Sequence, residues 1–298
     1  MLQQTARLIE SQWKQIGSQE FSIDQFIINF TRLIESLERS FSRQQIVEAL
    51  APFWRQLSSS PFVHRAQQWP RGYAGDYETI DYILRGKNGA SAEGAGYELE
   101  EFLLNSPICR QHRNKIGRQS ALIKEAIISN NRARILSIGC GTSEDLVQNL
   151  EHLIHSSANV TLMDIDDAAL KHSASRLAPI KERLALIRGN IYRSAARIPG
   201  QFDLVIIGGV FDYLDDRMVI AVLSALQPRI AEGGVLFFTN IRSDNPYRVC
   251  MEYMANWQLI HRSDEDILRI IRASGLQGFQ CLLTTDDTGL THLVSLHA

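Results

Sequence analysis

The sequence predicts a doubly wound α/β fold, in which a mostly parallel sheet follows an N-terminal helical domain. In the second half of the chain, short apolar segments alternate with helical patterns, which is typical of βαβ units and a parallel sheet. The first segment, 135–138, runs into a tight glycine turn, as the first strand of such a sheet does. The last two segments, 279–285 and 291–296, are joined by a short turn and predict a hairpin. We therefore expect a seven-stranded sheet with an antiparallel last strand.

Four further apolar segments predict the strands between these ends, at residues 159–164, 184–187, 202–207 and 233–239. Each segment ends in a polar residue or is followed by glycine or a polar residue, and these residues include Asp164, Asn190, Gly208 and Asn240. In open α/β sheets a ligand binds outside the carboxyl ends of the strands. An acid at the end of the second strand can accept hydrogen bonds from both hydroxyls of a ribose, so Asp164 indicates a ribose-containing ligand.

The glycine turn after the first strand indicates which ligand of this kind fits. Gly139 and Gly141 let a ligand approach the backbone closely. A dinucleotide-binding turn has a third glycine and holds a pyrophosphate at the start of the helix, but this turn continues into Glu144 and Asp145. Two carboxylates would repel a pyrophosphate, whereas S-adenosylmethionine (SAM) carries no phosphate. The turn therefore favours SAM over a nicotinamide dinucleotide, and an ordinary strand–helix turn is the alternative.

The order of the strand ends resembles that of the SAM-dependent class I methyltransferases over about residues 115 to 298. This resemblance implies a Rossmann-like seven-stranded methyltransferase sheet with SAM as its cofactor. Carried over by position, the cofactor-binding residues are Gly139 and Gly141 beside the methionine part, Asp164 at the ribose, and Asn190 and Ile191 near the adenine. Ile165 and Gly208 are further candidates for contact with the cofactor.

Two serines depart from the general class I pattern. Ser137 stands where an acid often begins the first motif, which removes a usual partner for the amino group of SAM. The carboxylate of Asp76 or the carbonyl of Gly208 could replace it. Ser143 stands where a third glycine is common. These departures motivate an alternative function, a non-catalytic regulator that binds SAM.

Composition and charge argue against several other classes of function. A formal net charge of −2, with acidic and basic residues interspersed, gives no basic face for a nucleic acid. The sequence has no apolar run of membrane-spanning length and no charged-then-apolar leader at Met1. The four cysteines lie far apart, and the histidines lack ligand spacing, which argues against disulfides and a metal site. We expect a cytoplasmic protein that acts on a small-molecule acceptor, binds no nucleic acid and does not insert into membranes.

Residues 1–58 are predicted to be helical. Ser22 and Ser42 each stand three residues before a glutamine, as in a capping box, and apolar residues at helical spacing follow both. We expect a helical and lid region over residues 1–114 and a methyltransferase domain over residues 115–298. The apolar stripes predict core packing within the chain, and packing on a second copy to form a homodimer is the alternative.

A segment rich in glycine and aromatic residues, 69–77, breaks the helical pattern. Loops positioned by a rigid scaffold often carry binding residues, so this segment is a candidate lid over the cofactor. Tyr73 could meet the methionine end of SAM, Asp76 its amino group or the acceptor, and Tyr77 the acceptor. An aromatic-anchored loop without a binding role is the alternative. The glycine-rich segment 86–96 is predicted to be a flexible connector.

Two further segments supply candidate binding residues. The predicted helix 107–129 leads into the first strand, and its Arg113 could pair with the carboxylate of SAM. The segment 240–262 is dense in polar and aromatic residues just past the fifth strand, where an acceptor would approach the methyl group. A helix cap followed by an ordinary amphipathic helix is the alternative there. The candidate acceptor contacts are Tyr77, Tyr213, Asn240, Arg242, Arg248 and Glu252.

Four motifs narrow the resemblance. They are Pro-Arg-Gly-Tyr-Ala-Gly-Asp-Tyr, Val-Phe-Asp-Tyr-Leu, Asn-Pro-Tyr-Arg, and Met-Glu-Tyr followed by Trp-Gln-Leu-Ile-His-Arg. From about residue 60 to the end, the chain resembles the bacterial methyltransferases of extracellular-factor hydroxypalmitate methyl ester biosynthesis. That resemblance implies methyl transfer from SAM to the carboxylate of a hydroxy fatty acid.

The acceptor decides whether a base is needed. A carboxylic acid with a pKa of about 4 to 5 is already ionised at neutral pH, so its methylation requires positioning alone. Tyr247 is then a catalytic candidate as an anchor for the acceptor. An amine, a phenol or a carbon acid would need a base, for which Asp76, Asp212 and Glu252 are the candidates. N- or C-methylation of another small metabolite is therefore the alternative reaction.

Overall fold

The structure, a computed structural model, describes residues 1–17 and 21–298. The chain divides into two compact units. The helical unit comprises residues 1–110 and 246–258, and the sheet unit comprises residues 111–245 and 259–298. The segment 246–258 thus packs with the N-terminal helices, although it follows a strand of the sheet in sequence.

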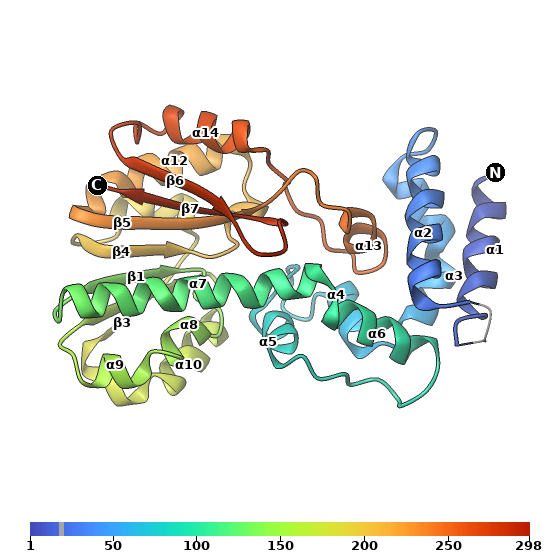
Figure 1. Ribbon diagram of the computed structural model, residues 1–298, viewed down its shortest axis with the longest axis horizontal. Helices are drawn as coiled ribbons and strands as arrows, with labels where there is room; N and C mark the ends of the chain where they lie inside the picture. The colour runs from blue at the N-terminus through green and yellow to red at the C-terminus, as the bar shows by residue number, and fades with distance from the viewer. Residues whose placement is uncertain (18–20) are drawn as a thin grey trace. The chain divides into compact units, whose positions relative to one another are not determined.

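The helical unit is built from helices (Figure 1), several of which begin at a serine or aspartate that caps them. Its helices are α1 (Leu2–Trp13), α2 (Ile23–Glu38), α3 (Arg43–Leu57), α4 (Pro61–Gln68), α5 (Tyr77–Arg85), α6 (Ala95–Asn105) and α13 (Arg248–Tyr253). Ser42 forms the predicted capping box with Gln45, in which each side chain accepts a hydrogen bond from the other residue's backbone amide. Ser22 caps α2, but the Gln25 side chain donates to Asn29, so the reciprocal half of the predicted box is absent there.

The core of the helical unit confirms that the N-terminal apolar stripes pack within the chain. Trp13, Phe26, Phe30 and Phe53 come from α1, α2 and α3 and are all buried. The centroids of neighbouring rings lie 5.6–6.0 Å apart in edge-on and tilted arrangements. Such aromatic pairs contribute about 0.5–1.5 kcal/mol each beyond the burial of their surface.

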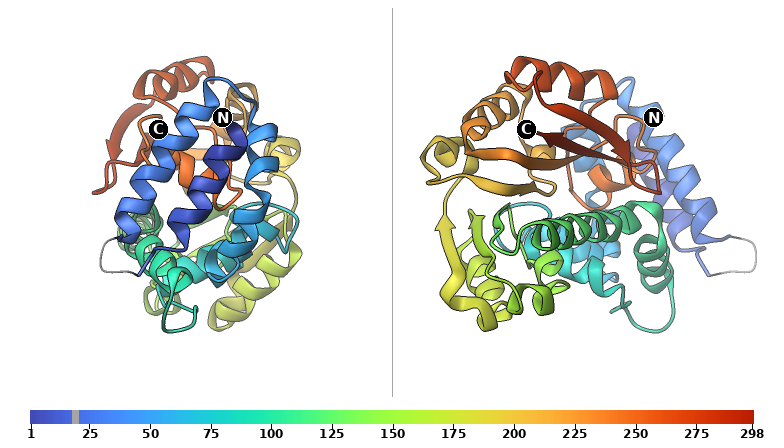
Figure 2. Two further views of the ribbon diagram at one scale, coloured as in Figure 1. Left: turned by 90° about the vertical axis from the view of Figure 1, so that its right-hand side faces the viewer. Right: turned by 60° about the vertical axis from the view of Figure 1, so that its left-hand side comes forward.

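The sheet unit contains the predicted seven-stranded sheet, in the order β3-β2-β1-β4-β5-β7-β6. Its strands are β1 (Arg134–Ile138), β2 (Asn159–Asp164), β3 (Leu184–Arg188), β4 (Phe202–Ile207), β5 (Ile230–Ile241), β6 (Gln280–Thr285) and β7 (Thr291–His297). β7 is antiparallel to both of its neighbours, β5 and β6. Figure 2 shows β6, in red, at one edge of the sheet. The predicted fold is therefore confirmed.

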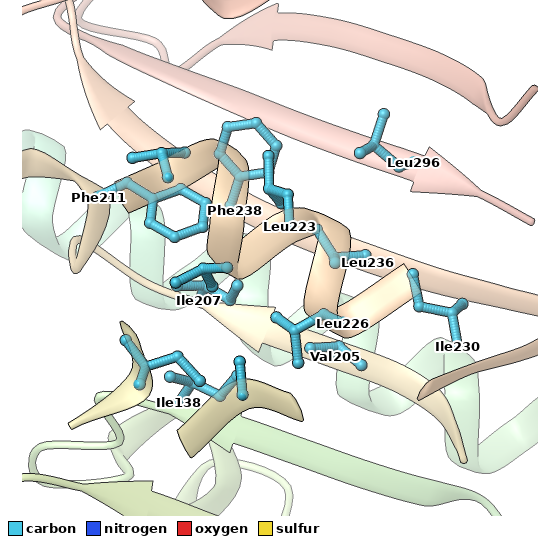
Figure 3. Close-up of a cluster of buried hydrophobic side chains, with 14 of the residues drawn as sticks. Ile138, Val205, Ile207, Phe211, Leu223, Leu226, Ile230, Leu236, Phe238 and Leu296 are labelled. Carbon is cyan, nitrogen blue, oxygen red and sulfur yellow. The ribbon is translucent and has the colours of Figure 1, made fainter. Parts of the chain in front are cut away.

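Helices cover both faces of this sheet. They are the main part of α7 (Pro107–Ser129), α8 (Glu144–Val147), α9 (Leu150–Ile154), α10 (Asp167–Arg176), α11 (Ile191–Ser194), α12 (Asp216–Leu226) and α14 (Asp264–Ala273). On one face, Leu223 and Leu226 of α12 join a buried cluster with Val205 and Leu236 of the sheet (Figure 3). A second buried cluster contains Ile123 of α7 together with residues of β1, β2 and β4. Two separate apolar clusters are what a doubly wound sheet requires.

The strand registers bring the carboxyl ends of the parallel strands to one edge. Ile138, the last residue of β1, lies opposite Met163 of β2 and Ile207 of β4. Ile207 in turn lies opposite Phe238 of β5. The turns that follow these strands are therefore neighbours in space. Within residues 1–17 and 21–298, no helix combines the length and apolar character needed to span a membrane.

Candidate functional site

The turn after β1 has a backbone that requires glycine. Gly139 has a φ of +64° and Gly141 a φ of +53°. A Cβ on Gly139 would lie 2.3 Å from Cγ2 of Val210, in the segment after β4. The amides of Gly139 and Cys140 both donate to the carbonyl of Met163, at 2.8 and 3.3 Å. The turn is thus held against the ends of β2 and β4, with its backbone open to close approach by a ligand.

Asp164 connects this turn to the end of β2. Its Oδ2 accepts the amide of Gly141 at 3.0 Å, and its Oδ1 accepts the amide of Asp166 at 2.9 Å. Burial raises the pKa of this carboxyl, and these backbone donors oppose that shift. The thiol of Cys140 also lies 3.9 Å from Oδ2. A carboxylate offers about four acceptor positions, so it can still accept from a ribose hydroxyl. Asp164 therefore fits the role predicted for it while also fixing the turn.

The ends of β2 and β3 present two exposed apolar side chains. Ile165 is 55% exposed and Tyr192 is 46% exposed, whereas Ile191 is only 6% exposed and belongs to the core. Asn190 caps α11 by accepting the amide of Tyr192 at 2.9 Å, and its amide nitrogen is left to donate. Asn190 and Ile191 were predicted from the sequence to lie near the adenine, but Tyr192 was not. The sequence does contain a feature that could have indicated Tyr192, because an aromatic residue directly after Asn190–Ile191 can offer a ring face to an adenine.

The two acids after the glycine turn differ in their surroundings. Glu144 forms an ion pair with Arg176 at 2.6 Å, and Arg176 also donates to the carbonyl of Thr142. The charge of Glu144 is therefore compensated, and its repulsion of a pyrophosphate is weaker than the sequence argument assumed. Asp145 is buried, and burial raises its pKa to about 6. The expected repulsion of a dinucleotide's pyrophosphate at this turn thus depends mainly on the charge of Asp145.

The segment after β4 is tightly organised. The amide of Gly209 donates to Thr239 at 2.9 Å, and a Cβ on Gly208 would lie 2.2 Å from Nε2 of Gln119 on α7. Asp212 is buried, and its Oδ1 accepts the amide of Ile241 at 2.7 Å. Burial raises the pKa of Asp212, whereas Lys115 and Arg262 oppose that shift. Neighbouring Tyr213 is 43% exposed.

The predicted acceptor contacts at the end of β5 have partners within the sheet unit. Asn240 is buried, donates to the carbonyl of Ile260 at 2.9 Å and accepts from Arg262. Arg242 forms ion pairs with Asp244 at 3.1 Å and Asp264 at 2.8 Å. These side chains therefore organise the segment after β5, and an acceptor would compete with those partners.

The remaining predicted residues lie in the helical unit, apart from Arg113 on α7. Asp76 caps α5, accepts the amide of Thr79 at 2.9 Å and pairs with Arg65 at 2.9 Å. Arg248 pairs with Glu38 at 2.6 Å and with Glu252 at 3.3 Å. Tyr73 and Tyr77 flank Asp76, and Tyr247 is half-buried before α13. Of these predicted residues, the structure brings Arg248 together with Glu252.

The predicted lid segment is irregular only in part. Residues 69–76 contain no regular helix or strand, and α5 begins at Tyr77. In the part of the chain that the structure describes, no group of three histidine, cysteine, aspartate or glutamate side chains could hold a metal ion.

Comparisons with known proteins agree with this geometry. Residues 136–236 match the sequence profile of a family described as a methyltransferase domain. No protein of curated function matches the chain by sequence. A possible exported protein from Bordetella parapertussis has a similar fold over 99% of this chain and 95% of its own, with 15% identity and a TM-score of 0.64. Magnesium protoporphyrin IX methyltransferase from Synechocystis, solved with bound SAH, is similar over 74% of this chain and 94% of its own, with 13% identity and a TM-score of 0.51.

The matched residues include the turn after β1, the ends of β2 and β3, and the segment after β4. These are the elements that form the glycine turn, the Asp164 carboxylate and the glycines facing α7. With the profile match and the fold in agreement, the chain is an enzyme with a methyltransferase domain.

Proposed function

We propose that this enzyme transfers the methyl group of SAM to the carboxylate of a small hydroxy acid, with hydroxy fatty acids as the first class to test. The main support for SAM binding is the hydrogen bond between the amide of Gly141 and the carboxylate of Asp164, at the edge where the parallel strands end. When bound, SAM supplies an electrophilic methyl group on a sulfonium. The glycine turn, Asp164, Ile165 and Asn190 would hold its nucleoside there.

The carboxylate acceptor is supported by the partners of the acidic side chains. Asp76 is occupied by Arg65 and the cap of α5, and Glu252 pairs with Arg248. Asp212 uses one oxygen to hold the amide of Ile241. A carboxylate acceptor is ionised near neutral pH and needs none of them as a base. The four motifs that resemble hydroxypalmitate methyl ester biosynthesis support the same acceptor.

The acceptor can be identified by the stability of the product. The enzyme is incubated with methyl-tritiated SAM and a panel of hydroxy fatty acids, and the extracted product is treated with mild base. Label that escapes as volatile methanol identifies a methyl ester and supports the proposal. Base-stable label would assign N- or C-methylation instead. SAM binding without transfer to the panel or to a small-molecule extract of the host would indicate a regulator.

A matched pair of variants ties transfer to the proposed site. Asp164→Ala is expected to abolish binding and transfer, because the ribose loses its acceptor. Asp167→Ala changes a carboxylate three residues away that is 46% exposed and forms an ion pair with Lys171. This control is expected to behave as the wild type.

A further inference from the structure

Lys115 of α7 is a buried lysine without a hydrogen-bonding partner. Its side chain is 7% exposed. Among residues 1–17 and 21–298, none accepts a hydrogen bond from its ammonium or lies close enough for an ion pair. Burial lowers the pKa of Lys115, while the charges of Asp212 and Asp286 oppose that shift. An ammonium that keeps only slight contact with water and has no acceptor on the protein is costly, so a group that binds it would stabilise this site.

Lys115 and Asp212 both lie close to Gly209, after the end of β4. The Cβ position of Gly209 lies 3.4 Å from Nζ of Lys115 and 3.7 Å from Oδ2 of Asp212. The two charged atoms nevertheless do not approach within the 4.0 Å of an ion pair. Gly209 has a φ of +79° and no side chain to fill the space between them. A small polar group can therefore reach both charges.

Asp286 does not compete for Lys115 in the same way. Its carboxylate accepts the amides of Thr288 and Thr291 at 3.1 and 3.0 Å and the side-chain amide of Asn114 at 2.9 Å. Asp212 accepts one backbone amide, through Oδ1. The under-bonded charges at this point are therefore one cation, on Lys115, and one anion, on Asp212.

This pair of charges faces the region that the proposed function gives to the methionine part of SAM. Gly139 of the turn after β1 lies against Val210, the residue that follows Gly209. In the same region, Ser137 of β1 cannot supply the carboxylate that the sequence pattern led us to expect for the amino group of SAM. The site thus lacks an acid on β1 but has one after β4.

We propose, on the basis of the proposed function, that Lys115 and Asp212 together bind the zwitterionic amino-acid end of SAM. Lys115 binds the carboxylate, and Asp212 binds the α-ammonium through Oδ2. The ammonium and the carboxylate of an amino acid are attached to the same carbon atom, so one ligand can supply a partner to both side chains. Charge-assisted hydrogen bonds of this kind are about twice as strong as neutral ones. Lys115 thereby takes the role that the sequence had suggested for Arg113.

The contacts of Lys115 and Asp212 can be tested separately with three ligands, whose affinities for the full chain are measured by isothermal titration calorimetry. SAM has both charged groups, decarboxylated SAM keeps only the amine, and 5′-methylthioadenosine has neither. Lys115→Met is expected to weaken SAM about 10-fold or more and to leave the other two ligands within about twofold. Asp212→Asn keeps an acceptor for Ile241 and is expected to weaken SAM and decarboxylated SAM alike, but not methylthioadenosine.

Lys124→Met is the matched control, because Lys124 is an exposed lysine on the same helix. Affinity ratios between ligands are unaffected by a variant that is partly unfolded, so a structural role cannot imitate the expected pattern. Equal weakening of all three ligands by Lys115→Met, or no weakening, would overturn the inference and leave the proposed function intact. If the wild type binds none of the three ligands, the proposed function fails together with the inference.

Discussion

The backbone amide of Gly141 donates to Oδ2 of Asp164 at 3.0 Å, so the turn after β1 and the end of β2 form one hydrogen-bonded structure. The second carboxylate oxygen holds the amide of Asp166 at the start of the next helix. The conformation of the turn therefore depends on the same side chain that we propose as the acceptor for the ribose.

Asp164→Ala is expected to lose SAM binding and also stability. The amides of Gly141 and Asp166 lose their acceptor, and an unsatisfied buried amide costs about 1–3 kcal/mol. Calorimetric titration with SAM and urea unfolding measure the two effects separately. Loss of binding with an unchanged free energy of unfolding would show that Asp164 does not support the turn. Unchanged binding would remove it from the ribose site.

Gly139→Ala is expected to destabilise the turn by about 1–2 kcal/mol and to weaken SAM binding. A left-handed backbone costs an L-residue about 1–2 kcal/mol, and the new Cβ would contact Val210 at 2.3 Å. Gly117→Ala on α7 is the matched control, because a Cβ there meets nothing within 4 Å. Since alanine favours a helix over glycine by about 1 kcal/mol, this control should stabilise the protein. Equal shifts in the melting temperature of the two variants would show that the turn does not require glycine at position 139.

Strands and their ends could be predicted because their signals are local. The predicted segment 202–207 coincides with β4, and Asp164 and Gly208 stand where a parallel sheet places them. The positions of Lys115 beside Gly209 and of Gln119 beside Gly208 could not be predicted. Their contacts depend on which face of α7 packs on the sheet, and charged and polar residues occupy several faces of that helix.

The contacts that the predicted acceptor-binding residues make could not be predicted from the sequence either. Arg248 pairs with Glu38, which lies 210 residues earlier in the chain. The predicted connector 86–96 shows a related difference. Its composition indicates flexibility, but Gly89 donates to the buried carboxylate of Glu100 at 2.6 Å. A single long-range contact of this kind leaves no pattern in composition.

Glu100→Ala is expected to lower the free energy of unfolding of the helical unit by about 2–4 kcal/mol. The Glu100 carboxylate is fully buried and accepts from Ser60, Phe62, Tyr82 and Gly89, so its removal leaves four donors without a partner. Limited proteolysis should then cleave the connector before Gly94 faster than in the wild type. Glu98→Ala, at an exposed position on the same helix, should change stability by less than about 0.5 kcal/mol. Unchanged proteolysis in Glu100→Ala would mean that the carboxylate does not hold the connector.

Asp145→Asn is expected to make the protein more stable at neutral pH. Burial raises the pKa of the Asp145 carboxyl from 3.8 to about 6 in the folded state, so the folded protein binds its proton more tightly than the unfolded chain does. Stability is therefore lost as the pH rises from about 4 to about 6, and the full cost, about 3 kcal/mol at most, is present above that range. Asparagine keeps an acceptor for the amide of Leu146 and does not ionise. In urea unfolding, the variant should match the wild type near pH 4 and exceed it increasingly up to pH 7. A stability difference that is constant across this range would show that Asp145 has an ordinary pKa in the folded protein.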